Sequence, residues 1–180
     1  MRYALRWIAL GALATATAGC AAGSGRINTV SYNGYDPSYV ADVATDGALP
    51  VRVIGQPAAN VAGEEAASQI GDAMTGANFG TQIEYDVYVE PPENGYVLVV
   101  RFGGGTPAGR LCGGAVDGGV GPEYAMAFCK DGHALSYLSG VSASADVTSE
   151  AFRHGMRIAA IEMFPPQNPE LDCGLEDECD

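Results

Sequence analysis

Residues 82–90 read Gln-Ile-Glu-Tyr-Asp-Val-Tyr-Val-Glu, and residues 96–102 read Tyr-Val-Leu-Val-Val-Arg-Phe. The first segment alternates between two kinds of side chain, which predicts a strand with one buried and one wet face. The second segment is apolar on both faces, which predicts a central strand. Residues 91–95, Pro-Pro-Glu-Asn-Gly, predict the turn between them. A β-sheet is therefore expected at the centre of the fold.

The flanking sequence predicts helices and a hairpin. Residues 51–53 are a short strand, and a helical pattern runs from Asn60, a candidate N-cap, to Gly76. Lys130-Asp131-Gly132-His133 separates two apolar runs, and Asp-Gly in that position is a strong hairpin signal. A second amphipathic helix is expected over residues 149–163, with Val147 as a staple at its entry.

The predicted elements follow one another as strand, helix, several antiparallel strands and helix. This order predicts an α+β fold: a mainly antiparallel sheet of about five strands, with two helices packed on one face. Residues 49–166 would form this domain. Residues 20–48 are predicted to be a tether, whose tyrosines fold onto the domain or onto a partner. Residues 167–180 would be a loose acidic tail that contains cysteines.

The start of the chain has the parts of an export signal. A basic segment, residues 1–6, precedes an apolar run over residues 7–18 and the sequence Thr17-Ala18-Gly19-Cys20. The apolar run is too short to cross a bilayer, which needs roughly 20 residues. Residues 1–19 are therefore predicted to be a cleavable signal peptide.

The ending Ala18-Gly19-Cys20 resembles the lipobox of bacterial lipoproteins, although Thr17 stands where leucine is usual. The resemblance implies that the Cys20 thiol is acylated, that the signal is cut before it, and that the new amine can be acylated too. Ala21, rather than aspartate, then implies the periplasmic face of the outer membrane in a cell with two membranes. The alternative is an ordinary signal cut nearby, with Cys20 a free thiol.

The end of the second helix reads Met163-Phe164-Pro165-Pro166. With the lipobox and the strand-helix-strands-helix order, this resembles a group of uncharacterised small envelope lipoproteins whose domain closes in Phe-Pro-Pro. The likeness covers residues 49–166 in outline, and the glycine-rich stretch with its two cysteines departs from it. The resemblance implies no catalytic residues.

The charge of the exported chain limits its partners. Removal of residues 1–19 from 180 leaves 161 residues, with 7 basic and 22 acidic side chains and a formal charge of −15. Such a surface repels phosphate backbones, so nucleic acid is excluded as a partner. Cationic ligands, divalent ions or a basic protein face remain.

Four cysteines follow Cys20, and an even number in an exported chain favours disulfides. Local order favours pairing the first with the second and the third with the fourth: Cys112, Cys129, Cys173 and Cys179. A zinc site is the alternative. Against it, the chain has no Cys-x-x-Cys pair, and His133 and His154 lack ligand spacing.

The sequence gives little support to catalysis. The glycine-rich residues 103–121 lack the Lys-Ser/Thr of a phosphate-binding loop and are expected to be a long, flexible excursion. A serine hydrolase would need a serine, a histidine and an acid together, and no Gly-x-Ser-x-Gly elbow is present. Ser139, His133 and His154 have ordinary structural explanations. No catalytic residue and no cofactor is predicted.

The sequence therefore predicts a non-enzymatic, lipid-anchored envelope protein. It would meet the membrane through the lipid on Cys20 and bind an envelope protein with a basic face. One alternative is an envelope hydrolase of unrecognised type. Another is a weak calcium-binding module, because residues 172–180 carry five carboxylates, although a solvated tail also explains them.

Overall fold

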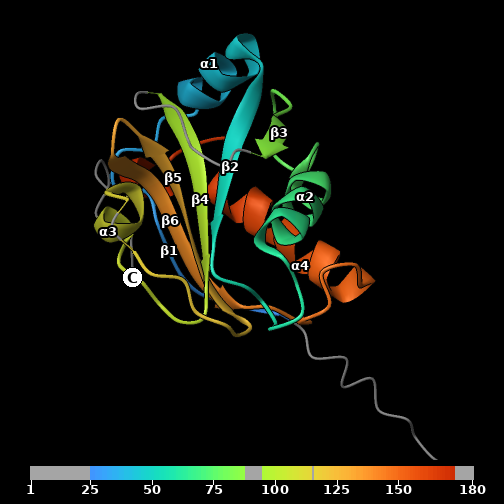
Figure 1. The fold of residues 1–180 in the computed structure, drawn as a ribbon. Coiled ribbons are helices and arrows are strands. Elements are labelled where there is room, and N and C mark those ends of the chain that lie inside the picture. The colour runs from blue at the N-terminus through green and yellow to red at the C-terminus, as the bar shows by residue number, and fades with distance from the viewer. Residues whose placement is uncertain (1–24, 88–94, 115, 173–180) are drawn as a thin grey trace, which may run out of the picture.

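A six-stranded mixed sheet, in the order β1-β6-β5-β4-β2-β3, forms the centre of the fold (Figure 1). The computed structural model describes residues 25–87, 95–114 and 116–172. The strands are β1 (Arg26–Ser31), β2 (Ala48–Ile54), β3 (Glu84–Val87), β4 (Tyr96–Phe102), β5 (Glu123–Lys130) and β6 (His133–Val141). The helices of the described residues are α1 (Ser38–Asp46), α2 (Gly63–Met74), α3 (Ala108–Cys112), α4 (Glu150–Met163) and α5 (Pro169–Asp172).

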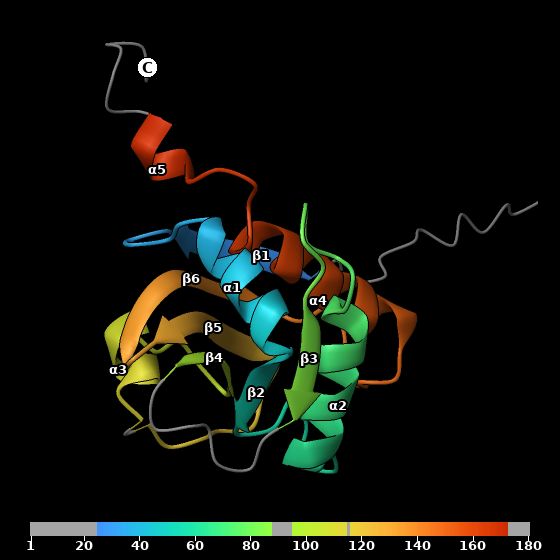
Figure 2. The same cartoon turned by 90° about the horizontal axis from the view of Figure 1, so that it is seen from above.

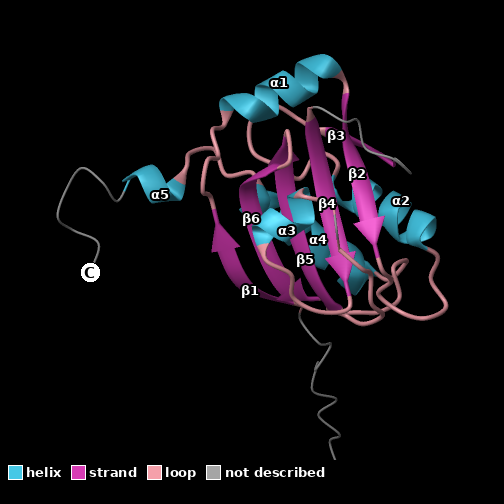
Figure 3. Cartoon of the chain, turned by 60° about the vertical axis from the view of Figure 1, so that its left-hand side comes forward, coloured by secondary structure: helices cyan, strands magenta, loops and turns pink. Residues whose placement is uncertain are grey.

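The two faces of the sheet carry different layers. Helices α2 and α4 cover one face, α3 lies on the other, and α1 lies over one end of the sheet (Figures 1 and 2). The main core lies between the sheet and α2 with α4, and its largest fully buried side chains include Leu49, Ile70, Phe102, Phe128 and Phe152. Figure 3 shows α3 in front of the sheet. A smaller cluster under α3 joins Leu111 to Val99 and Ala127.

Elements with strong local signals form as predicted. Asp131 and Gly132 both have positive φ, 50° and 79°, and connect β5 to β6 in an antiparallel hairpin. Ser149 caps α4, and its Oγ accepts a hydrogen bond of 3.2 Å from the Phe152 amide. Strand β4 is central, between β5 and β2.

The α+β class is confirmed, but the sheet differs from the prediction of about five mainly antiparallel strands. Strand β2 pairs in parallel with both β3 and β4. Strands β3 and β4, which were expected to be joined by a turn, do not pair with each other, because they lie on opposite sides of β2. Residues 91–94 of that predicted turn lie outside the described residues. Helix α2 makes the crossover from β2 to β3, which is how parallel neighbours are joined.

Most of the segment predicted as a tether belongs to the fold. Strand β1 pairs with β6, and α1 follows it. Tyr32 and Tyr35 are buried in the main core. Their hydroxyls donate to the carbonyl oxygens of Glu162 (2.7 Å) and Pro165 (2.9 Å). Within the described residues the domain thus starts with β1, and five positions, residues 21–25, lie between Cys20 and this strand in the sequence.

The predicted tail also begins later than expected. Asn168 is buried, and its Nδ2 donates to the carbonyl oxygens of Tyr35 (2.9 Å) and Tyr32 (3.3 Å). Helix α5 follows. Residues 173–180, with most of the acidic cluster, lie outside the described residues. Helix α2 has Ala62 rather than the predicted Asn60 at its N-cap.

The glycine-rich stretch is folded closely against the sheet, contrary to the predicted flexible excursion. Gly119 bonds through its amide to the Phe102 carbonyl (3.1 Å) and through its carbonyl to the Gln56 amide (2.8 Å). A Cβ on Gly55, whose φ is 79°, would lie 2.5 Å from the Gly119 oxygen. Glycine is required there because two backbones touch. Arg101 secures the same stretch with bonds to the carbonyl oxygens of Gly104 and Asp117.

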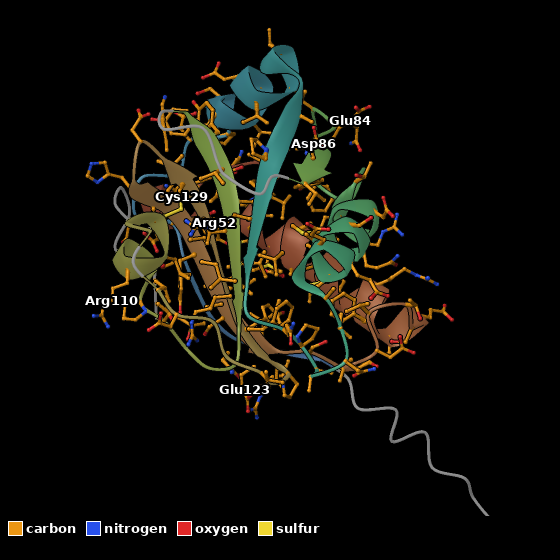
Figure 4. All side chains as sticks on the ribbon, in the orientation of Figure 1. Arg52, Glu84, Asp86, Arg110, Glu123 and Cys129 are labelled. Atoms are coloured by element: carbon orange, nitrogen blue, oxygen red, sulfur yellow. A yellow bond between two sulfur atoms is a disulfide. The ribbon has the colours of Figure 1, made fainter. Side chains whose placement is uncertain are left out.

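Helix α3, within this stretch, was not expected. Its Leu111 is fully buried, and the Cys112–Cys129 disulfide joins it to β5 with a Cα–Cα distance of 5.6 Å. This is the pairing that the local order of the cysteines favours. Cys129 and Arg52 both lie on the side of the sheet that α3 covers (Figure 4). No helix among the described residues is long and apolar enough to cross a bilayer.

Candidate functional site

A pocket of about 270 Å³ opens where β1 begins, β6 ends and α4 passes over them. We call it the β1–α4 pocket. Its lining comes from four elements and the residues beside them: Gly25, Ile27, Tyr124, Val141, Ser142, Ala143, Ala151, His154, Gly155, Met156 and Ile158. These elements meet only in the folded chain, because β1 is the first strand and α4 follows the last one.

The wall of the β1–α4 pocket is mostly apolar. Ile27 packs against the main core, Met156 is fully buried, and Ile158 at the rim is 37% exposed. Ser142 is the polar group of the β6 side, and its Oγ donates to the Ser144 carbonyl oxygen at 2.7 Å. That hydroxyl already has a partner within the chain.

Tyr124 supplies an unengaged hydroxyl to the pocket. The residue is 3% exposed, and burial raises the pKa of its hydroxyl to about 12, so the group stays protonated. The hydroxyl lies against Gly140, where a Cβ would be 2.9 Å from it. Among the described residues it has no hydrogen-bond partner. It is therefore a donor available to a bound molecule.

Local sequence determines how α4 meets the pocket. Val147, the predicted staple, is buried in the main core, and the Ser149 cap fixes the first turn. Asp146 accepts hydrogen bonds from the Thr148 hydroxyl (2.7 Å) and amide (2.9 Å). Both bonds lower the pKa of the Asp146 carboxyl, and the bond from the Thr148 hydroxyl has the larger effect. The turn before α4 is thus held by charge-assisted bonds.

The residues considered for hydrolysis are not brought together. Ser139 pairs with Ala125 of the small cluster under α3, so its side chain lies on the α3 face. His133 stands opposite Lys130 at the hairpin turn. His154 lies on α4, on the other face, and lines the pocket. This pocket was not predicted from the sequence. A signal that could have indicated it is Gly155, a glycine inside a strong helical pattern.

Other polar clusters are satisfied within the fold. At the far end of β5, the Lys130 ammonium donates to the Tyr96 hydroxyl (2.9 Å) and lies over the Tyr39 and Tyr96 rings. The Tyr96 hydroxyl donates to Asp42 (3.1 Å). This cluster fastens α1 to the hairpin.

The described residues hold no group of three or more histidine, cysteine, aspartate or glutamate side chains that could bind a metal. The predicted lipidation residue Cys20 lies outside the part of the chain that the structure describes. So do Cys173, Cys179 and all but the first residue of the predicted calcium-binding tail.

Comparison with known proteins gives no relative: no family model, no curated protein and no solved structure matches this chain.

Proposed function

We propose that this chain is a lipid-anchored protein of the bacterial cell envelope whose domain binds another envelope component and catalyses no reaction. The observation that carries the proposal is the β1–α4 pocket. Its wall is mostly apolar, and the hydroxyl of Ser142 is engaged by Ser144. Pockets that are largely apolar with a few polar groups bind ligands by burial and shape.

The anchoring part of the proposal rests on the lipobox resemblance at Cys20. Residues 21–25 would then be the whole link between the lipid and β1. Five extended residues span about 17 Å. The domain would stay close to the bilayer, with the start of β1 nearest to it.

The charge of the domain supports a partner with a basic face. Five exposed carboxylates lie on α2 and β3, which pack together: Glu64, Glu65, Asp72, Glu84 and Asp86. Glu84 and Asp86 project outward from the edge strand (Figure 4). Surface charge of this kind mainly raises the association rate and selects the partner, and salt screens it over about 8–10 Å.

Crosslinking in cells tests the binding proposal. A partner captured by the wild type should be captured less by the double variant Glu84→Gln with Asp86→Asn, and its association should slow as salt rises. The matched control is Asp117→Asn with Glu123→Gln, which removes the same charge from residues outside α2 and β3. Equal capture by both double variants would contradict the proposed acidic interface.

The hydrolase alternative has its own test. Ser139→Ala and His133→Ala should leave the phenotype of the intact gene unchanged, because neither side chain lies in the pocket. Purified protein should release no p-nitrophenol from p-nitrophenyl esters above the rate with unfolded protein. Turnover above that rate would make the hydrolase the better explanation.

A further inference from the structure

The β1–α4 pocket lies where the anchor would enter the domain. Gly25 lines the pocket and immediately precedes β1, so the pocket is within five residues of Cys20. That link reaches about 17 Å when it is extended. Both the lipid on Cys20 and the surface of its bilayer would therefore be within reach of the pocket. This step rests on the proposed function.

Gly155 gives the pocket its depth on the α4 side. A Cβ at this position would meet no atom within 4 Å. Packing therefore does not require glycine at position 155. Glycine also makes the middle of a helix less stable than alanine would. Gly71 of α2, another glycine inside a helix, is different, because a Cβ there would lie 3.3 Å from the Cβ of Tyr85. The open space beside Gly155 belongs to the pocket.

The shape and chemistry of the pocket select a ligand class. Its volume of about 270 Å³ equals that of roughly nine water molecules at about 30 Å³ each, which leaves room for a short stretch of aliphatic chain. Ile27, Val141 and Met156 offer an aliphatic wall, and the Tyr124 hydroxyl offers one donor without a partner among the described residues. An aliphatic chain that carries an acceptor oxygen satisfies both features.

We propose that the β1–α4 pocket binds one acyl chain of a lipid, with the Tyr124 hydroxyl donating to the carbonyl or carboxyl oxygen of that chain. The acyl chain has two sources within reach: the lipid on Cys20 and a free lipid of the same membrane. Both present the same chemistry to the pocket.

Binding of cis-parinaric acid, a fluorescent fatty acid, tests the inference. The protein is the mature chain from residue 20 onward with Cys20→Ser, exported behind an ordinary signal peptide. Gly155→Leu fills the pocket and should weaken binding by roughly tenfold or more. Gly63→Leu is the matched control, because a Cβ at that helix position also meets open space and Gly63 does not line this pocket. Tyr124→Phe should weaken binding roughly 2–10-fold, the effect of one hydrogen bond.

The source is determined by comparing the Cys20→Ser chain with the lipidated wild type in detergent micelles. If the wild type no longer takes up the probe, its own acyl chain occupies the pocket. If it binds the probe equally well, the ligand is a free lipid. No binding to the Cys20→Ser chain, or equal binding by Gly155→Leu and Gly63→Leu, would overturn the inference. Membrane fractionation and partner capture of the wild type are measured separately, so the proposed function can survive that result.

Discussion

Replacement of Asn168 by alanine should destabilise the domain through one buried amide. Asn168 is 8% exposed and donates from Nδ2 to the carbonyl oxygens of Tyr32 and Tyr35. Its Oδ1 accepts from the Glu170 amide at 3.0 Å. One side chain thus ties the segment between β1 and α1 to the segment after α4. Alanine removes all three hydrogen bonds.

The magnitude follows from the number of bonds and their burial. A hydrogen bond contributes about 1 kcal/mol net, and a buried carbonyl that loses its donor costs more. The bond to the Glu170 amide lies nearer the surface, where water can replace the side chain. The expected loss in the free energy of unfolding is therefore about 2–3 kcal/mol. In a chain of this size that lowers Tm by roughly 5–10 °C.

Urea denaturation followed by circular dichroism measures this loss. The matched control is Gln167→Ala, which removes an exposed amide next to the same position and should change stability by less than about 0.5 kcal/mol. The slope m should stay the same, because the folded state buries the same surface. A loss below about 0.5 kcal/mol for Asn168→Ala would refute the reasoning, and with it the assignment of residues 167–172 to the domain.

Four further predictions follow from the described contacts. Replacing both Cys112 and Cys129 by alanine should cost about 3 kcal/mol, the effect of opening a loop of this length, and unchanged urea midpoints would contradict it. Gly55→Ala should cost about 2–5 kcal/mol, from a positive φ and a contact with the Gly119 oxygen, and a calorimetric Tm near wild type would exclude that contact. Tyr85→Phe should leave stability unchanged or raise it by about 1 kcal/mol, because the buried hydroxyl has no partner among the described residues, whereas a clear loss would reveal one. Burial raises the pKa of Tyr124 from 10.0 to about 12. The contribution of the protonated Tyr124 hydroxyl to the free energy of unfolding is therefore complete below pH 10 and is lost as the pH rises toward 12. Tyr124→Phe should reduce this alkaline loss of stability.

Elements whose signals are local could be predicted from the sequence. The Asp131-Gly132 turn needs positive φ at two adjacent residues, and this pair adopts it readily. Ser149 lies three residues before the amide that it caps. Strand β4 is apolar on both faces, so its central position could be predicted from its own residues alone. In each case the deciding residues lie within a few positions of one another.

Strand β1 was missed because its register is broken. A shift between Ile27 and Thr29 interrupts the pairing with β6, and Ile27 and Val30 both pack against the main core. Three positions separate these two residues, so the alternation that reveals a strand is absent. The parallel pairing of β2 was missed for another reason. Nothing in β3 or β4 shows that a strand from earlier in the chain lies between them.

The glycine-rich stretch shows why composition alone misled. Many glycines close together are typical of flexible segments. Here Gly119 packs on the backbones of Gly55 and Gly103, and glycine is needed for that close approach. Gly103 opens the same stretch, directly after β4, but Gly55 lies directly after β2 and far away in the sequence.

The candidate site could not have been assembled from the sequence. Tyr124 reads as an ordinary inward residue of a hairpin strand, and His154 as an exposed helix residue. The pocket forms where the start of β1, the end of β6 and α4 meet, and β1 is far from the other two in the sequence. Gly155, a glycine in a helix without a packing reason, is the residue that a closer sequence reading could have selected.

If the chain is exported as proposed, the position of β1 also constrains how the domain is completed during translocation. Arg26 pairs with Val141, which lies 115 positions later in the chain. A chain that crosses the membrane from its N-terminus presents this strand long before β6 emerges. If Cys20 is fastened to the bilayer, the waiting strand stays at the membrane surface, away from other nascent chains that could pair with its open edge. If Cys20 carries a lipid as proposed, we expect that lipid to keep the first strand in place until its partner arrives.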